Sequence, residues 1–256
     1  MPLILITNDD GIEAEGLNCL EEHLKELAEV IVVAPDIGRS GISHALTIDR
    51  SLRLKSLSPN RHTLDGTPAD CVIHALRYVV RARPDLVISG INHGSNLADD
   101  IMYSGTVAAA REASKFGIPS IAVSQEYDER PIQFKEGARF VRELLRKMLT
   151  QNLDKSLCLN INIPVRRIKG VKITRQGYSV PPPNYADNQS GPETGAEDVD
   201  SPESEIMLDY KAVAASYISV TPLQRDQTDY DKARSLMKEA PRLFQGFRIP
   251  GFGLIR

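Results

Sequence analysis

The chain has 256 residues, of which 41% are hydrophobic and 25% charged, and its formal net charge is −3. This composition is typical of one globular α/β domain, and the slight negative charge argues against a protein that tracks a nucleic-acid polymer. No apolar run reaches the length of a membrane span and no basic leader precedes the first strand-like run, so we expect a cytoplasmic protein without a membrane partner. The three cysteines lie far apart, which indicates buried apolar positions rather than disulfides or a zinc site.

The first predicted strand, residues 3–6, leads through Thr7 into the polar run Asn8-Asp9-Asp10-Gly11. Four consecutive apolar residues indicate a strand that is buried on both faces. Two adjacent carboxylates at its end repel each other and resist the loss of water, and a divalent cation would compensate both effects. The alternative is a turn that only caps the following helix.

A βαβ unit follows from the next apolar segments. Leucines at helical spacing predict an amphipathic helix over residues 17–27, and residues 30–34 form a second apolar strand. A strand, a helix and a strand within about thirty residues predict a parallel sheet. The polar loop 38–44 comes next, residues 52–64 indicate short antiparallel strands, and Thr67 is expected to cap a helix that begins with proline.

The third core strand, residues 85–89, leads into the glycine- and amide-rich loop 90–96. An alanine-rich helix is predicted over residues 107–115, and either Ser104 or Thr106 is placed to cap it. Free backbone N–H groups and hydroxyls at a helix N-terminus attract anions, although ordinary capping explains the same residues.

Residues 120–124 and 157–163 predict two more core strands, separated by an amphipathic helix over residues 134–148. The expected fold is therefore α/β, with a doubly wound, mostly parallel, Rossmann-like sheet and helices on both faces. We divide the chain into an α/β core with the catalytic site, residues 1–170, and a C-terminal extension of the same domain, residues 171–256.

The extension differs from the core in pattern. Residues 171–174 indicate a short strand, and Ile206-Met207-Leu208 together with residues 213–220 are strand-like, which predicts a β-hairpin arm. A short helix is expected from Asp229, and the apolar tail 244–255 is expected to contact a partner subunit in an oligomer.

Polar loops follow three strands of the predicted parallel sheet, and in open parallel sheets ligands bind at the carboxyl ends of the strands. The oxygen donors of these loops are Asp9, Asp10, Ser40 and Asn92. This all-oxygen set suits magnesium, manganese or calcium rather than zinc. The candidate anion donors are Ser104, Gly105 and Thr106. The sequence therefore predicts a site for a metal ion and a phosphate.

Several motifs together resemble the SurE (survival protein E) family, and they run in family order over most of the chain. They are Asn8-Asp9-Asp10-Gly11, Val33-Ala34-Pro35, Arg39-Ser40-Gly41-Ile42-Ser43, Gly66-Thr67-Pro68-Ala69-Asp70-Cys71, Ser89-Gly90-Ile91-Asn92, Tyr103-Ser104-Gly105-Thr106-Val107, Asn160-Ile161-Asn162-Ile163-Pro164 and Thr221-Pro222. The sequence departs from the resemblance at Ala98 and Ala113, where glycine is expected.

The resemblance implies a 5′/3′-nucleotidase that hydrolyses nucleoside monophosphates and also acts on short-chain polyphosphate. It implies a homodimer or homotetramer built through the C-terminal arm. It also implies a divalent cation, Mg²⁺ or Mn²⁺, held by Asp9, Asp10, Ser40 and Asn92.

On this basis the expected catalytic residues are Asp9, Asp10, Asn92 and Ser104. The expected phosphate-binding residues are Ser40, Gly41, Asn96, Ser104, Gly105 and Thr106. We favour Asp9 as the residue that orients the attacking water, and an aspartyl-phosphate intermediate or a general acid at His44 or His93 are alternatives.

Rival classes are a non-catalytic nucleotide-binding module and a dehydrogenase. The sequence has no GxGxxG after the first strand, no P-loop motif and no GxSxG elbow, which disfavours a dehydrogenase, a P-loop enzyme and a serine hydrolase.

Overall fold

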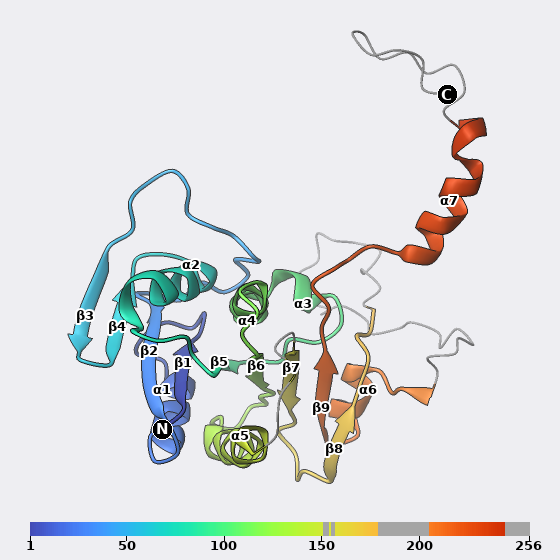
Figure 1. The fold of residues 1–256 in the computed structure, drawn as a ribbon. Coiled ribbons are helices and arrows are strands. Elements are labelled where there is room, and N and C mark those ends of the chain that lie inside the picture. Colours follow the sequence, from blue (N-terminus) through green and yellow to red (C-terminus); the bar gives the residue numbers. More distant parts are fainter. Residues whose placement is uncertain (151–153, 155–156, 179–204, 244–256) are drawn as a thin grey trace. The chain divides into compact units, whose positions relative to one another are not determined.

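The computed structural model describes residues 1–150, 154, 157–178 and 205–243. The chain forms two compact units, residues 1–223 and 224–256. In the first unit the described residues form one sheet with the strand order β3-β4-β2-β1-β5-β6-β7-β9-β8 (Figure 1). The strands are β1 (Leu3–Thr7), β2 (Glu29–Pro35), β3 (Leu54–Ser58), β4 (Arg61–Leu64), β5 (Leu86–His93), β6 (Ser120–Gln125), β7 (Cys158–Ile163), β8 (Gly170–Ile173) and β9 (Tyr217–Pro222).

Helices cover both faces of this sheet, as the doubly wound prediction requires (Figure 1). They are α1 (Glu15–Leu24), α2 (Pro68–His74), the π-helical turn η1 (Ala75–Val79), α3 (Asp100–Tyr103), α4 (Gly105–Lys115), α5 (Phe134–Leu149) and α6 (Asp209–Ala214). Helices α1 and α5 pack together on one face, where the leucines of α1 are fully buried. Helices α2 and α4 pack together on the other face. The predicted α/β class is therefore confirmed.

The strands β2, β1, β5, β6 and β7 run parallel to one another. The chain passes from β1 to β2 on one side and later returns to β5 on the other side of β1. The carboxyl ends of β1 and β5 therefore flank the topological switch point, where open α/β sheets bind ligands. Thr7 pairs with Ser89 across these two strands, so the residues that follow each of them meet at one edge.

The predicted cap at the start of α2 is confirmed. The hydroxyl of Thr67 accepts the backbone N–H of Asp70 at 3.1 Å, and the Asp70 carboxylate accepts the backbone N–H of Thr67 at 2.9 Å. Pro68 occupies the first helical turn, where its missing N–H would have no partner in the helix. The pair of predicted strands before this helix is present as the antiparallel strands β3 and β4.

The predicted hairpin between residues 206–208 and 213–220 is wrong. Asp209–Ala214 form α6, and β9 joins the central sheet beside β7 and β8. The Asp209 carboxylate at the start of α6 is buried and accepts the backbone N–H groups of Ala98, Gly177 and Tyr210. The bond from Tyr210 supplies a partner to one of the first N–H groups of α6, which have none within the helix, and the bonds from Ala98 and Gly177 hold the helix start against distant segments.

The second unit contains α7 (Tyr230–Leu243), close to the helix predicted from Asp229. Its side chains Tyr230, Leu236 and Met237 are exposed. The apolar tail 244–255 lies outside the described residues. In the described part of the chain, none of the helices is both long and apolar enough to cross a lipid bilayer.

Candidate active site

Asn8 shapes the turn that carries the two aspartates. Its side-chain amide donates to the carbonyl oxygen of Gly11 at 2.9 Å, and its side-chain oxygen accepts the backbone N–H of Gly11 at 3.2 Å. Gly11 has a φ of +104°, which only glycine adopts without strain. The turn therefore closes on itself without using either carboxylate.

Asp9 is the more buried member of the pair, with 4% of its surface exposed. Burial raises the pKa of its carboxyl group to about 6, and the nearby charge of Asp10 adds to this increase. The hydroxyl of Thr106 opposes the increase by donating a hydrogen bond to Oδ1 of Asp9. Keeping this carboxylate charged at neutral pH is costly unless a positive charge lies near it.

Asp10 connects the end of β1 to the end of β5. Its Oδ2 accepts the backbone N–H of His93 at 3.0 Å, and burial raises the pKa of this carboxyl group as well. In β5, the amide nitrogen of Asn92 donates to the carbonyl oxygen of Gly94 at 2.8 Å, which fixes the orientation of its carboxamide. Among the described residues, Oδ1 of Asp10 and Oδ1 of Asn92 have no hydrogen-bond donor.

These three side chains fit a hard divalent cation. The carboxylate pair supplies negative charge in a desolvated position, and the remaining oxygens of Asp10 and Asn92 are available as ligands. The described residues contain no cluster of three or more histidine, cysteine or acidic side chains that could hold a metal ion. A metal here would therefore depend on carboxamide or hydroxyl oxygens and on water in addition to the two aspartates.

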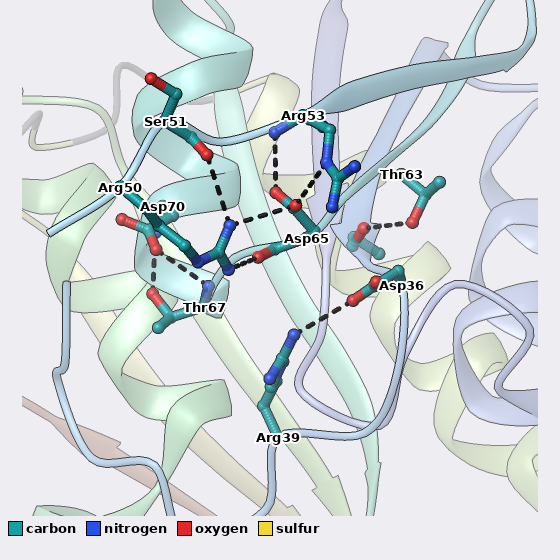
Figure 2. Close-up of polar contacts among 10 residues, drawn as sticks. Asp36, Arg39, Arg50, Ser51, Arg53, Thr63, Asp65, Thr67 and Asp70 are labelled. Atoms are coloured by element: carbon teal, nitrogen blue, oxygen red, sulfur yellow. Dashed lines mark hydrogen bonds and ion pairs between the residues drawn. The ribbon is translucent and has the colours of Figure 1, made fainter. Parts of the chain in front are cut away.

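The loop after β2 brings Ser40 and Gly41 to the same edge. The backbone N–H of Arg39 donates to the carbonyl oxygen of Asp9 at 2.7 Å, and the backbone N–H of Ser43 donates to that of Tyr103 at 2.9 Å. The guanidinium group of Arg39 contacts Asp36 at 3.1 Å (Figure 2). These bonds anchor the loop on both sides of Ser40, which is itself exposed.

The segment between this loop and α2 has its own polar framework (Figure 2). The carboxylate of Asp65 accepts the backbone N–H of Arg53 at 2.7 Å and also contacts Arg50 at 3.1 Å. The Asp70 carboxylate accepts the backbone N–H of Thr47 in addition to that of Thr67. This framework fixes the path of the chain between β2 and α2.

The N-terminus of α4 lies against Asp9. Ser104 caps the helix by accepting the backbone N–H of Val107 at 3.0 Å, and its hydroxyl proton is not used in that bond. Gly105 packs against the aspartate: a Cβ at this position would lie 2.9 Å from Cβ and 3.0 Å from Oδ2 of Asp9. The helix thus presents a hydroxyl and N–H groups next to the carboxylate pair.

Asn96 is held by residues at the ends of β6 and β7. Its side-chain amide donates to the Ser124 hydroxyl at 2.7 Å, and its backbone N–H donates to the Asn162 side chain at 2.8 Å. Its carbonyl oxygen accepts the side-chain amides of Asn160 and Asn162. The structure therefore brings Gly105 and Thr106 into direct contact with Asp9. It places Asn92 next to His93, the residue that binds Asp10, and it bonds Asn96 to Ser124, Asn160 and Asn162.

Two features of this region were missed by sequence reasoning. Thr106 was considered only as a phosphate donor or a cap, whereas its hydroxyl binds Asp9. Glu112, whose side chain is 2% exposed, binds His44 at 2.8 Å and Lys115 at 2.9 Å, and so connects the loop after β2 to α4. No local signal reveals the bond between His44 and Glu112, because the two residues are 68 positions apart.

Comparisons with known proteins agree with this architecture. The sequence profile of the family described as "Survival protein SurE" matches residues 4–181. The "5'-nucleotidase SurE" of Aquifex aeolicus is 42% identical over 246 residues, which cover 92% of this chain and 97% of that protein. The protein of the same name from Pelobacter propionicus is 41% identical over 238 residues, covering 89% and 95% of the two chains.

A solved structure gives the same result. The crystal structure of the SurE protein from Aquifex aeolicus superimposes with a TM-score of 0.80 at 40% sequence identity, and the match covers 94% of this chain and 99% of that one. The matches in sequence and in fold extend over most of both chains and include the strands and loops that carry the carboxylate pair. The chain therefore belongs to the SurE family.

Proposed function

We propose that the protein is a metal-dependent phosphomonoesterase that hydrolyses nucleoside 5′- and 3′-monophosphates to nucleoside and phosphate, with short-chain polyphosphate as a further substrate. The observation that carries this proposal is the desolvated pair Asp9 and Asp10 beside the N-terminus of α4. A negative pair next to an anion-binding helix end suits a phosphate only when a cation lies between them. The name 5'-nucleotidase carried by both relatives supports a nucleotide substrate.

In this proposal Asp9, Asp10, Asn92 and Ser40 hold a Mg²⁺ or Mn²⁺ ion. When bound, such an ion neutralises charge on a phosphoryl oxygen and lowers the pKa of a coordinated water molecule. Asp9 also orients the attacking water, since Thr106 holds one of its oxygens and leaves the other for the site. Asn92 has its carboxamide oxygen available as a ligand, because its amide nitrogen already donates to the carbonyl oxygen of Gly94.

The phosphate is bound in this proposal by α4 and by the loop after β2. Ser104 donates its free hydroxyl proton, and the N–H groups of Gly105 and Thr106 bind the phosphoryl oxygens that gain charge in the transition state. Gly41, which has a φ of +68° and open space where a Cβ would lie, lets the backbone approach a phosphate closely. Asn96 supports this edge from the side of β6.

Phosphate release tests the proposal. The protein is first treated with EDTA and then assayed with magnesium, manganese or no metal on nucleoside 5′- and 3′-monophosphates and on tripolyphosphate. We expect release that depends on the added metal. Asp10→Asn should abolish most activity while the circular dichroism spectrum is retained, whereas Asp49→Asn, a change at an exposed aspartate outside the site, should leave activity unchanged.

Other outcomes would contradict parts of the proposal. Full activity of Asp10→Asn with magnesium would show that the metal assignment is wrong. A folded protein that binds nucleotides but releases no phosphate with any metal would instead be a nucleotide-binding module.

We also propose that the protein is a homodimer or homotetramer. The exposed apolar side chains Tyr230, Leu236 and Met237 of α7 support this, because such residues usually pack against another surface. Light scattering at micromolar protein concentration measures the native mass. A monomeric mass would contradict the proposal.

A further inference from the structure

Two aromatic rings lie stacked at the rim of the candidate site. The rings of His93 and Tyr127 have centroids 4.7 Å apart and planes inclined by 27°. His93 is the last residue of β5, and Tyr127 follows the end of β6 by two residues. Both side chains are exposed, and 57% of the surface of Tyr127 is accessible to solvent.

This pair is connected directly to the carboxylate pair. The backbone N–H of His93 donates to Oδ2 of Asp10 at 3.0 Å, so the aromatic pair begins at a residue that contacts a proposed metal ligand. Gly94 has a φ of +111°, and a Cβ added at this position would lie 3.5 Å from the Tyr127 ring, so the ring also lies over the next residue along the chain. The platform is therefore part of the edge that carries Asp10 and Asn92.

We propose that His93 and Tyr127 form a stacking platform for the base of the nucleotide substrate. This inference rests on the proposed function. In a nucleoside monophosphate only the sugar separates the base from the phosphate, so a phosphate bound next to a cation on Asp10 would leave the base close to His93. An exposed aromatic face binds any base through stacking, and larger ring systems gain more from this contact. The platform therefore favours purine over pyrimidine nucleotides.

A purely structural role is the rival explanation, in which the two rings only fasten the segment after β6. The chain contains a suitable comparison, because His74 and Tyr78 form a second histidine–tyrosine pair with centroids 5.5 Å apart. Tyr78 is 69% exposed and lines a cavity of about 630 Å³ together with Leu3 and Glu29. Those two residues begin β1 and β2, so this second pair lies at the opposite edge of the sheet.

The test compares Tyr127→Ala with Tyr127→Phe and with the control Tyr78→Ala. KM and kcat are measured for adenosine 5′-monophosphate, for uridine 5′-monophosphate and for ribose 5-phosphate, which has no base. We expect Tyr127→Ala to raise KM for the adenine nucleotide by about fivefold or more, with a smaller increase for the uracil nucleotide. KM for ribose 5-phosphate and all kcat values should stay unchanged. Tyr127→Phe and Tyr78→Ala should behave as the unaltered protein.

The remaining outcomes overturn the inference. An equal rise of KM for adenosine 5′-monophosphate and ribose 5-phosphate would show that Tyr127 only supports the site. Unchanged KM values would show that no base stacks there. If the unaltered protein hydrolyses none of these substrates, the proposed function fails by itself. The stacking proposal is then tested without hydrolysis, by calorimetric titration of adenosine 5′-monophosphate into the unaltered protein and into Tyr127→Ala. Equal affinities of the two proteins would overturn it.

Discussion

The hydroxyl of Thr106 donates a hydrogen bond to Oδ1 of Asp9 and so joins the N-terminus of α4 to the end of β1. Burial and the neighbouring Asp10 raise the pKa of Asp9, and this bond is the largest contribution that lowers it. One residue thus keeps a buried carboxylate closer to its charged form and sets its orientation. The arrangement couples the proposed anion site to the proposed metal site, which residue types alone would not indicate.

Replacing Thr106 with valine removes this donor and keeps the shape of the side chain. We expect the pKa of Asp9 to rise above about 6 and the affinity for Mn²⁺ to fall about tenfold, since a hydrogen bond to a buried charge contributes roughly 1.5–3 kcal/mol. Calorimetric titration with Mn²⁺ at pH 7 measures the change. Thr106→Ser keeps the hydroxyl and should bind Mn²⁺ normally. If Thr106→Val bound Mn²⁺ as tightly as the unaltered protein, the hydrogen bond from Thr106 would not contribute to cation binding by Asp9.

The raised pKa of Asp9 predicts that the free energy of unfolding of the metal-free protein depends on pH. Between pH 3.8 and about 6 the native carboxyl group keeps a proton that the unfolded chain releases, so stability falls as pH rises through this window. Above about pH 6 the whole loss of stability caused by the buried Asp9 charge is present. Asp9→Asn removes the charge and can still accept from Thr106, so it should stabilise the EDTA-treated protein at pH 7 by on the order of 2 kcal/mol.

Denaturant unfolding at pH 4 and pH 7, in EDTA, checks this prediction. At pH 4 the difference between Asp9→Asn and the unaltered protein should be small, because Asp9 is then largely protonated in the native state. Asp49→Asn serves as the control for removing an exposed charge. A variant less stable than the unaltered protein at pH 7 would contradict a desolvation cost at Asp9.

Much of the fold could be predicted because its signals are local. Unbroken apolar runs predicted the parallel strands, leucine spacing predicted α1, and the Thr67–Pro68 pair predicted the start of α2. The place of β9 between β7 and β8 could not be predicted, because it depends on pairing between distant segments. The helix α6 was missed because its first residue, Asp209, is positioned by contacts with distant segments, among them Ala98, which lies 111 residues away.

The same distinction holds for the site. The order of the elements was enough to predict that the residues after β1 and β5 lie at one edge of the sheet. The partner of each side chain was not predictable, because Thr106 is 97 residues from Asp9 and the choice between binding Asp9 and binding a ligand depends on the position of α4. The contact between His93 and Tyr127 likewise arises only when β5 and β6 pair.

The close packing of Gly105 against Asp9 predicts an effect of a single methyl group. In Gly105→Ala the new Cβ would lie 3.0 Å from Oδ2 of Asp9 and 3.0 Å from Ile42, so the carboxylate must move. We expect phosphate release to fall by about tenfold or more, because small displacements at a reacting centre have large effects on rate. Gly38→Ala is the matched control: its Cβ would meet only the carbonyl oxygen of Asp10, at 3.6 Å. Equal activity of the two variants would show that the position of Asp9 is not critical.

Ala98 and Ala113 stand where glycine is expected, and we predict that replacing each with glycine changes stability in opposite directions. Ala98 has a φ of +50°, and this conformation costs an L-residue roughly 1–2 kcal/mol, whereas glycine loses about 0.5–1 kcal/mol more backbone entropy on folding. Ala98→Gly should therefore stabilise the protein by up to about 1 kcal/mol. Ala113 is fully buried inside α4, so Ala113→Gly should destabilise the protein by about 1 kcal/mol or more.

Denaturant unfolding of the two variants and the unaltered protein measures both effects in one experiment. Each change removes a single methyl group. At Ala113 the methyl is also packed in the core, so the sign of the effect at Ala98 is the one that reports on backbone conformation. The backbone N–H of Ala98 donates to Asp209 at 2.9 Å, and this bond is retained in Ala98→Gly, so the loop should keep its position. If both variants were destabilised by a similar amount, the left-handed conformation at Ala98 would not be a source of strain, because glycine would then bring only its entropic cost.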